Sequence, residues 1–292
     1  VALSPDKTTE SDAAAQAATG ATITRLARER LLRRDPSRPL FLFVLYMDVH
    51  WDYLPPIPYS RMFTDDPVPP IRNIWSLGGK SVPEEARSRV VAAYDGEVRY
   101  TDTCISNLLN DISASPRAAN TVVAICADHG ESFWERGLVS HGNNFHSEEI
   151  HVPLILRPAA SAIVPVIKGS VVSNQVGLID LAPTFLDYAG IPPPKSWQGL
   201  SLRPFLSGGT IPDPPGVLDN RVGAIMRGVR TSKILIVGTY PFTEPSEVYD
   251  LAADHAEKNK LVLPGKPLPN GVADLVPLLK PFEHPPLPPL RK

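Results

Sequence analysis

The stretch TVVAICADHGESFWERGLVSHG, residues 121–142, is the part of the chain that indicates its fold most directly. Its first seven residues form a mainly apolar run, typical of a buried strand, which ends at Asp128 and His129. In an open α/β sheet, ligands bind where the carboxyl ends of the strands leave the sheet. Asp128 and His129 offer a carboxylate oxygen and an imidazole nitrogen to a divalent cation, and Gly130 allows a tight turn behind them. We therefore predict part of a metal site here; the alternative is a capping aspartate beside a surface histidine.

Two further histidines are candidates for the same site. His50 lies in MDVHWDYLPP, directly after the apolar run 40–47, and His141 lies in SHGNN. A protonated imidazole at residue 141 can pair with an anionic group or act as a general acid towards a leaving oxygen. For His50, packing among the neighbouring aromatic residues is the alternative. Both histidines stay candidates for catalytic roles at this point, and we predict structural roles for His146 and His151.

Three carboxylates near these histidines are candidates for orienting them. Asp48, Asp52 and Glu131 could hold the imidazole rings by hydrogen bonds, although solvated loop carboxylates would show the same pattern. Cys126, inside the strand, is predicted to be a small buried residue. With Cys104 it makes only two cysteines, which cannot form a disulfide scaffold or a four-cysteine zinc site.

Hydrophobic periodicity predicts the main elements of the first 160 residues. Helices are expected over residues 14–34 and 83–112, and strands over 40–47, 121–127 and 152–157. The strands are apolar runs flanked by helices and lack strict alternation of apolar and polar residues. This favours an α/β fold with a mostly parallel sheet and helices on both faces.

The pattern of apolar and polar residues changes in the last third of the sequence. A short helix is expected from Asp180, and AIMRGVRTSKILIVG and EVYDL read as short antiparallel strands. The end of the chain is proline-rich and is predicted to be an extended tail. We predict an α/β catalytic portion over residues 1–214, a small antiparallel α+β subdomain over 215–264 and a Pro-rich tail over 265–292.

The composition is that of a globular protein able to bury a full core. The 292 residues include 29 Lys and Arg and 31 Asp and Glu, and 43% are hydrophobic. This balance gives no electrostatic reason to expect a nucleic acid or an anionic membrane as a partner. The longest apolar run, residues 39–47, is too short to span a bilayer, so no membrane segment is expected. The chain opens on Val1 without a visible signal peptide, and we expect an N-terminal region outside it.

Six segments, in order between about residues 20 and 262, resemble the sulfatase family of the alkaline phosphatase superfamily. RPLFLFVLYMDVHWDYLPP is similar to a strand followed by D-P-H-x-P-Y-x-P-P, and TVVAICADHGES to the metal-binding strand and loop. HGNNFHSEEIHVPLILR resembles H-G-x-x-L-Y-x-E-x-x-R-V-P-L-I, and SEVYDLAADHAEKNKLV resembles E-L-Y-D-L-x-x-D-P-x-E-x-x-N-L. YDGEVRYTDTCISNLLNDI is similar to the family's long helix, and VGLIDLAPTFLDYAGIPPPKSWQGLSLRPFLSG to its D-L-x-P-T-L-L-x-x-A-G-I signature.

The resemblance implies a role for each candidate residue. Asp128 and His129 would be two ligands of a divalent cation, usually Ca²⁺ in sulfatases, with Mn²⁺ or Zn²⁺ as alternatives. His50 would contact the sulfate or the leaving oxygen, and His141 falls where relatives place a Lys or His that grips the sulfate. The substrate would be a sulfated small molecule or glycan, hydrolysed with help from the cation's charge. An extracytoplasmic location (periplasmic, secreted or membrane-tethered) is also implied.

Two parts of the family's site have no counterpart in the sequence. Sulfatases take two further aspartate ligands from D-D-x-R and form a formylglycine nucleophile from the cysteine of C-x-P-S-R, and neither segment is present. The segment RDPSR, residues 34–38, has Arg at the cysteine position and lies too late in the order. Asp52 also stands where the family usually has Pro. We therefore expect the formylglycine in an N-terminal region outside this chain, and we expect the chain alone to bind metal weakly and to turn over no substrate.

Two other functions stay open at this point. The first is a phosphodiesterase, phosphonate hydrolase or phosphoryl-group transferase of the same superfamily, with a Thr, Ser or formylglycine nucleophile. An Asp–His pair suits the Mn²⁺ or Zn²⁺ of such enzymes at least as well as Ca²⁺, which prefers shells made of oxygen. The second is a degenerate, non-catalytic relative that keeps the fold as a binding or structural domain.

Overall fold

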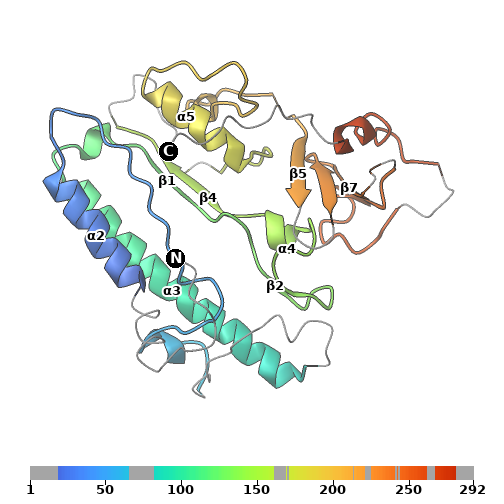
Figure 1. Ribbon diagram of the computed structural model, residues 1–292, viewed down its shortest axis with the longest axis horizontal. Coiled ribbons are helices and arrows are strands. Elements are labelled where there is room, and N and C mark those ends of the chain that lie inside the picture. The colour runs from blue at the N-terminus through green and yellow to red at the C-terminus, as the bar shows by residue number, and fades with distance from the viewer. Residues whose placement is uncertain are drawn as a thin grey trace, which may run out of the picture. The chain divides into compact units, whose positions relative to one another are not determined.

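The chain forms two compact units, which are described separately. A computed structural model describes residues 19–65, 82–160, 169, 171–212, 214–220, 225–240, 242, 244–261 and 267–280. Unit 1 comprises residues up to Thr121 together with Ser132–Ser140 and Ala159–Ser161. Unit 2 comprises Val122–Glu131, His141–Pro158 and the residues from Ala162 onwards. Figure 1 shows the elements along the chain.

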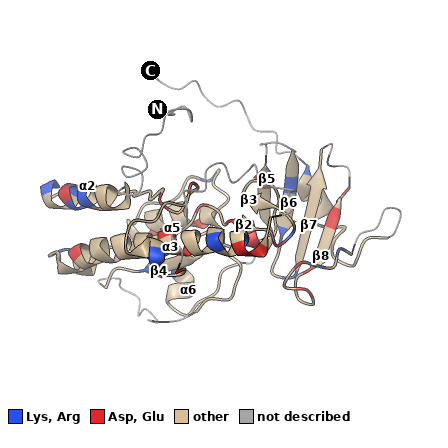
Figure 2. Ribbon diagram, turned by 90° about the horizontal axis from the view of Figure 1, so that it is seen from below, with Lys and Arg blue, Asp and Glu red and all other residues tan. Residues whose placement is uncertain are grey.

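Two long helices form the frame of unit 1 (Figure 1). They are α2 (Thr19–Arg33) and α3 (Glu84–Ala114), and they pack against each other. Both confirm the predicted helices over 14–34 and 83–112, of which residues 14–18 lie outside the described part. The last turn of α2 is basic and the first turn of α3 is acidic, so both ends suit the helix macrodipole. Figure 2 shows both basic and acidic positions along the α2 ribbon.

Buried carboxylates connect the loop around His50 to these helices. Asp48 Oδ1 accepts a hydrogen bond from Gly20 N at 2.8 Å and so satisfies a donor in the first turn of α2. Glu97 Oε1, on α3, accepts one from Leu54 N at 2.8 Å. The small 3₁₀ helix η1 (Tyr59–Arg61) also packs on α3. The core of unit 1 consists of Tyr53, Val90, Ala93, Trp134 and Val139.

The predicted strand over residues 40–47 is wrong. The segment is extended and its exposure alternates: Phe41 and Phe43 are 74% and 75% exposed, and the residues between the exposed ones are partly buried. A strand needs backbone hydrogen bonds to a neighbouring strand, and no ladder among the described residues includes this segment. The segment therefore has the side-chain period of a strand but belongs to no ladder among the described residues.

Unit 1 also contains a small hairpin from the middle of the 121–142 stretch. Strand β2 (Ser132–Phe133) pairs antiparallel with β3 (Val139–Ser140), and the turn is closed by a 2.7 Å hydrogen bond from Trp134 N to Leu138 O. The chain thus leaves unit 2 after Glu131 and returns to it at His141. Glu131 and His141, which are ten positions apart in the sequence, therefore both lie in unit 2, where their side chains are in contact.

Strands β1 (Val123–Cys126) and β4 (Leu154–Arg157) pair in unit 2 and confirm the predicted strands over 121–127 and 152–157. They are antiparallel, as is every other ladder in the described part, whereas the expectation was a mostly parallel sheet. The apolar runs indicated buried strands but carry no information about strand direction. Cys126 was predicted to be buried and is exposed, because two strands leave much of their surface uncovered.

A four-stranded antiparallel sheet forms the C-terminal part of unit 2 (Figure 1). Its strands, in spatial order, are β5 (Gly216–Asn220), β6 (Met226–Arg230), β7 (Ile234–Thr239) and β8 (Glu247–Asp250). Sequential neighbours pair throughout, so short turns suffice to connect them. The antiparallel strands predicted in this region are confirmed.

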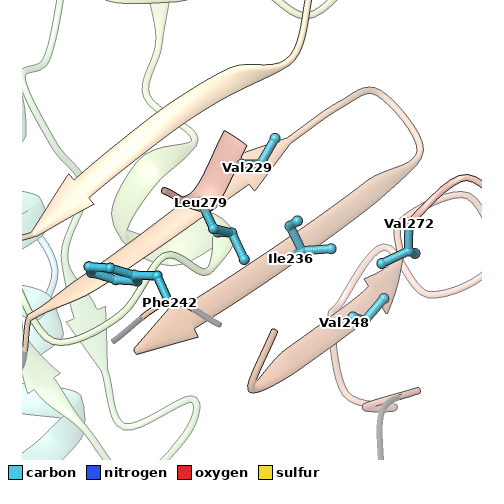
Figure 3. Close-up of a cluster of buried hydrophobic side chains, with 6 residues drawn as sticks. All are labelled: Val229, Ile236, Phe242, Val248, Val272 and Leu279. Atoms are coloured by element: carbon cyan, nitrogen blue, oxygen red, sulfur yellow. The ribbon is translucent and has the colours of Figure 1, made fainter. Parts of the chain in front are cut away.

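One face of this sheet is covered by the segment that follows it. The 3₁₀ helix η5 (Val276–Leu279) packs on β6 and β7, and Val272 and Leu279 are fully buried. Residues 267–280 are therefore not part of an extended tail, since they complete a hydrophobic cluster; residues 281–292 lie outside the described part. The domain boundaries proposed at residues 214 and 264 stay predictions. The cluster in Figure 3 consists of Val229, Ile236, Phe242, Val248, Val272 and Leu279.

Short helices complete unit 2. They are α4 (Ser147–Ile150), α5 (Leu181–Tyr188), preceded by η4 (Leu178–Asp180), and α6 (Arg203–Leu206). The helix predicted to start near Asp180 is confirmed, and Asp180 accepts hydrogen bonds from the backbone of Gly177 and Leu200. No helix within the described ranges is long and apolar enough to cross a membrane.

Candidate functional site

Asp128 and His129 lie side by side at the end of β1, where the sequence predicts a metal site. His129 Nε2 is 3.9 Å from Asp128 Oδ2, and the two side chains are 40% and 77% exposed. His129 Nδ1 lies 2.8 Å from Gly130 O. Because a carbonyl oxygen only accepts hydrogen bonds, Nδ1 carries the proton and Nε2 carries the lone pair in the neutral ring. One carboxylate oxygen and one imidazole nitrogen are thus close enough together to bind the same ion.

Gly130 is required here by a close approach of two backbones. Its N–H donates a 2.7 Å hydrogen bond to Glu149 O. A Cβ atom at Gly130 would collide with the carbonyl oxygen of Glu148, so only glycine fits. The sequence indicated a tight turn at this residue, but the partner across the gap lies nineteen positions further along the chain.

His141 stacks on His129 within unit 2. The centroids of the two imidazole rings are 4.0 Å apart, and their planes are inclined by 30°. His141 Nδ1 lies 3.2 Å from Glu131 Oε1, and the Glu131 side chain is only 5% exposed. This contact favours an orienting role for Glu131 over that of a solvated loop carboxylate. The hydrogen bond to Glu131 raises the pKa of His141, burial opposes it, and the charges of Glu131, Glu149 and Asp128 raise it further.

Glu149 accepts hydrogen bonds from the loop that begins at His141. The sequence did not identify Glu149 as a candidate. Its Oε2 accepts hydrogen bonds from Gly142 N at 2.7 Å and Asn143 N at 3.1 Å, and its Oε1 accepts one from Asn144 Nδ2 at 2.6 Å. The loop turns at Gly142, whose φ is 79°. The only signal in the sequence was an acidic residue in the first turn of a short helix, which the helix dipole explains equally well.

A buried ion network lies beside α4. Glu257 is fully buried and accepts hydrogen bonds from His146 Nδ1 at 2.8 Å, Ser147 Oγ at 2.6 Å and Arg230 Nη1 at 2.8 Å. Burial alone would raise the pKa of Glu257, but these hydrogen bonds and the charge of Arg230 lower it to about 2. His146 therefore joins α4 to β6 through Glu257, which agrees with its predicted structural role.

His50 belongs to unit 1, whereas Asp128, His129 and His141 belong to unit 2. Its Nδ1 is 2.6 Å from Trp51 O, so the proton again sits on Nδ1 and the lone pair on Nε2 in the neutral ring. A catalytic role for His50 stays a prediction. The neighbouring carboxylate of Asp48 binds the start of α2, which is a structural role.

The donor atoms fit part of a coordination shell for a divalent cation. Within the described part of the chain, no group of three or more His, Cys, Asp or Glu side chains is arranged to hold a metal ion. Asp128 and His129 supply two donors, and the Nδ1 hydrogen bond of His129 orients its ring as in many metal-bound histidines. The pair therefore accounts for some of the ligands that such an ion needs.

Asp128, His129 and the Glu131-bound His141 are thus gathered in one part of unit 2. The sulfatase family profile matches residues 9–191, more than half of the chain. The chain belongs to the sulfatase family.

Two curated relatives are similar to the chain in sequence, and one solved structure is similar in fold. The chain is 29% identical over 187 residues to an arylsulfatase of Clostridium perfringens, covering 59% of this chain and 38% of that protein. It is 30% identical over 203 residues to an N-acetylglucosamine-6-O-sulfatase of Bacteroides thetaiotaomicron, covering 63% and 34%. The chain thus spans little more than a third of these relatives' length. The phosphonate monoester hydrolase of Agrobacterium radiobacter shares the fold, with a TM-score of 0.69 and 22% identity over 83% of this chain and 56% of that one.

Proposed function

We propose that this chain carries part of the active site of a metal-dependent sulfate ester hydrolase. The observation that supports this most directly is the His129–His141 pair, with ring centroids 4.0 Å apart, flanked by Asp128 and Glu131. It combines two donors for a cation with an imidazole suited to an anion. A divalent cation bound there would supply positive charge to the sulfate oxygens.

His141 is the residue that contacts the sulfate in this proposal. Its Nδ1–H donates to Glu131, and in the protonated ring Nε2–H is the second donor. The raised pKa of His141 favours the charged ring, which can pair with a sulfate oxygen or give its proton to the leaving oxygen. His50 is proposed to contact the sulfate or the leaving oxygen from unit 1, with its ring oriented by Trp51 O.

The remaining parts of the proposal follow from family membership. The nucleophile is a formylglycine supplied by polypeptide outside these 292 residues, since the sequence contains no C-x-P-S-R. The cation is Ca²⁺, as in many sulfatases; Mn²⁺ or Zn²⁺ are alternatives that suit an imidazole ligand well. The substrate is a sulfated small molecule or glycan, a class to which one relative's name points. We propose an extracytoplasmic location from the family resemblance.

Two measurements on the chain test this proposal. Calorimetric titrations with Ca²⁺ and with Mn²⁺ should show weak binding, with a Kd on the order of 1 mM. Asp128→Asn should abolish that binding, whereas the same change at Asp102, exposed and paired with Arg99 on α3, should not. The chain should not hydrolyse an aryl sulfate by itself. Hydrolysis that disappears in Asp128→Ala would refute an external nucleophile, and Mn²⁺ binding that persists in Asp128→Asn would refute the cation site.

A phosphoryl or phosphonyl ester hydrolase is the second candidate. The mixed oxygen and nitrogen donors of Asp128 and His129 favour the metals such enzymes use, and the fold is shared with a phosphonate monoester hydrolase. Anion competition separates the two candidates. Sulfate should displace a weakly bound aryl sulfate better than phosphate does if the first proposal holds, and the reverse order would support the second.

A further inference from the structure

We infer that Glu149 is a positioning residue that joins the two loops of the proposed site, an inference that rests on the proposed function. Its backbone carbonyl accepts a hydrogen bond from Gly130, in the turn that carries Asp128 and His129. Its carboxylate accepts hydrogen bonds from the loop that begins with His141. One residue thus contacts both the cation-binding turn and the anion-binding loop.

The side chain of Glu149 has to be a carboxylate. Oε2 accepts from three backbone N–H groups, of Gly142, Asn143 and Asn144, and Oε1 accepts from the side-chain amide of Asn144. All of these partners are donors, so both oxygens of residue 149 must be acceptors. Glutamine has the same shape but would turn an NH₂ group towards one set of donors. Because Glu149 is only 3% exposed, water cannot readily replace the lost hydrogen bond.

Glu149 is itself held firmly by the surrounding structure. Its backbone N–H donates a 2.9 Å hydrogen bond to His146 O at the start of α4. His146 and Ser147 are bound to the buried Glu257. The turn at Gly130 approaches the carbonyl oxygen of Glu148 so closely that a Cβ would not fit between them. Because Glu149 is hydrogen-bonded to both loops, its position helps to set the distance between the rings of His129 and His141.

The deciding experiment compares Glu149→Gln with the wild-type chain by amide hydrogen exchange and nuclear Overhauser effects. We expect exchange at Gly142 and Asn143 to accelerate by at least about tenfold, since hydrogen bonds to a charged acceptor are lost. The contact between the His129 and His141 rings should weaken. Amides of β7 should exchange as in the wild type, because their ladder hydrogen bonds are made to β6 and β8 within the sheet. Glu85→Gln, an identical change at a 79% exposed side chain, is the matched control and should alter nothing.

A role in packing alone predicts different results. Glutamine is isosteric with glutamate, so it would preserve packing and leave exchange in residues 141–144 unchanged. That result, or an equal acceleration in β7, would overturn the inference. If Glu149→Gln does not fold, Asn144→Ala serves instead. It removes the donor to Oε1 and should speed exchange in residues 141–144 while sparing β7; unchanged exchange in both places would overturn the inference.

The readouts also separate this inference from the proposed function. Exchange and ring contacts are measured without cation or substrate, so they report positioning whether or not the chain binds Mn²⁺. If positioning and function both hold, Glu149→Gln should weaken Mn²⁺ binding by about tenfold, in step with the loss of a charge-assisted hydrogen bond. No Mn²⁺ binding by the wild type would count against the proposed cation site alone.

Discussion

Replacing Glu257 by glutamine should cost the protein about 3 kcal/mol of stability at neutral pH, and less as the solution is acidified. Glu257 is fully buried, and its carboxylate accepts hydrogen bonds from His146, Ser147 and Arg230. Glutamine cannot accept all of these hydrogen bonds, and it turns an NH₂ group towards donors. The change therefore removes the favourable interactions of the ionised carboxylate.

The magnitude follows from the pKa of this carboxyl. In the folded chain the pKa of Glu257 is lowered from 4.5 to about 2, a difference that corresponds to about 3 kcal/mol. A depressed pKa means that the stabilisation is present above the unfolded-state value. It is lost as the pH falls from 4.5 to about 2, because the unfolded chain takes up the proton first. In the most acidic part of this range, the neutral carboxyl and the neutral amide should become nearly equivalent.

Urea unfolding followed by circular dichroism measures this effect. The difference between the wild type and Glu257→Gln should be largest at neutral pH and should shrink steadily across the acidic range. Glu85→Gln, at an exposed position paired with Arg89, should change the unfolding midpoint little at any pH. A difference below about 1 kcal/mol at neutral pH, or one independent of pH, would refute the assignment of the stabilisation to the ionised carboxylate.

Three further changes have definite expected outcomes. His129→Ala should abolish the calorimetric Mn²⁺ signal by removing a predicted ligand, whereas the exposed His151→Ala should preserve it; binding in both variants would exclude His129. Gly130→Ala should destabilise the chain by about 2 kcal/mol in urea unfolding because its Cβ collides with Glu148 O, and an unchanged midpoint would contradict that crowding. Burial, with a smaller contribution from Asp48, raises the pKa of Glu97 from 4.5 to about 8, so stability is lost as the pH rises through this interval. Glu97→Gln should raise the melting temperature more in mildly alkaline than in mildly acidic buffer, and an equal effect in both would count against ionisation as the cause.

Local sequence patterns predicted the elements whose formation depends on local chemistry. The helical spacing of apolar residues predicted α2 and α3, and two apolar runs predicted β1 and β4. The same reasoning failed for residues 40–47, which have strand-like alternation but no ladder within the described residues. A strand is defined by a partner, and the partner is not encoded in the segment itself. For the same reason the runs did not reveal that β1 and β4 are antiparallel.

The sequence by itself determined which side chains could do the chemistry: Asp128 and His129 at the end of an apolar run, and His141 twelve residues after His129. Family membership is also a property of the sequence, since the sulfatase profile matches residues 9–191. Only the tertiary structure stacked His141 on His129 and placed Glu149 between their loops. A buried carboxylate is stable where several donors converge on it, and these donors come from separate loops. Their convergence is a property of the folded chain, so no local pattern could have identified Glu149.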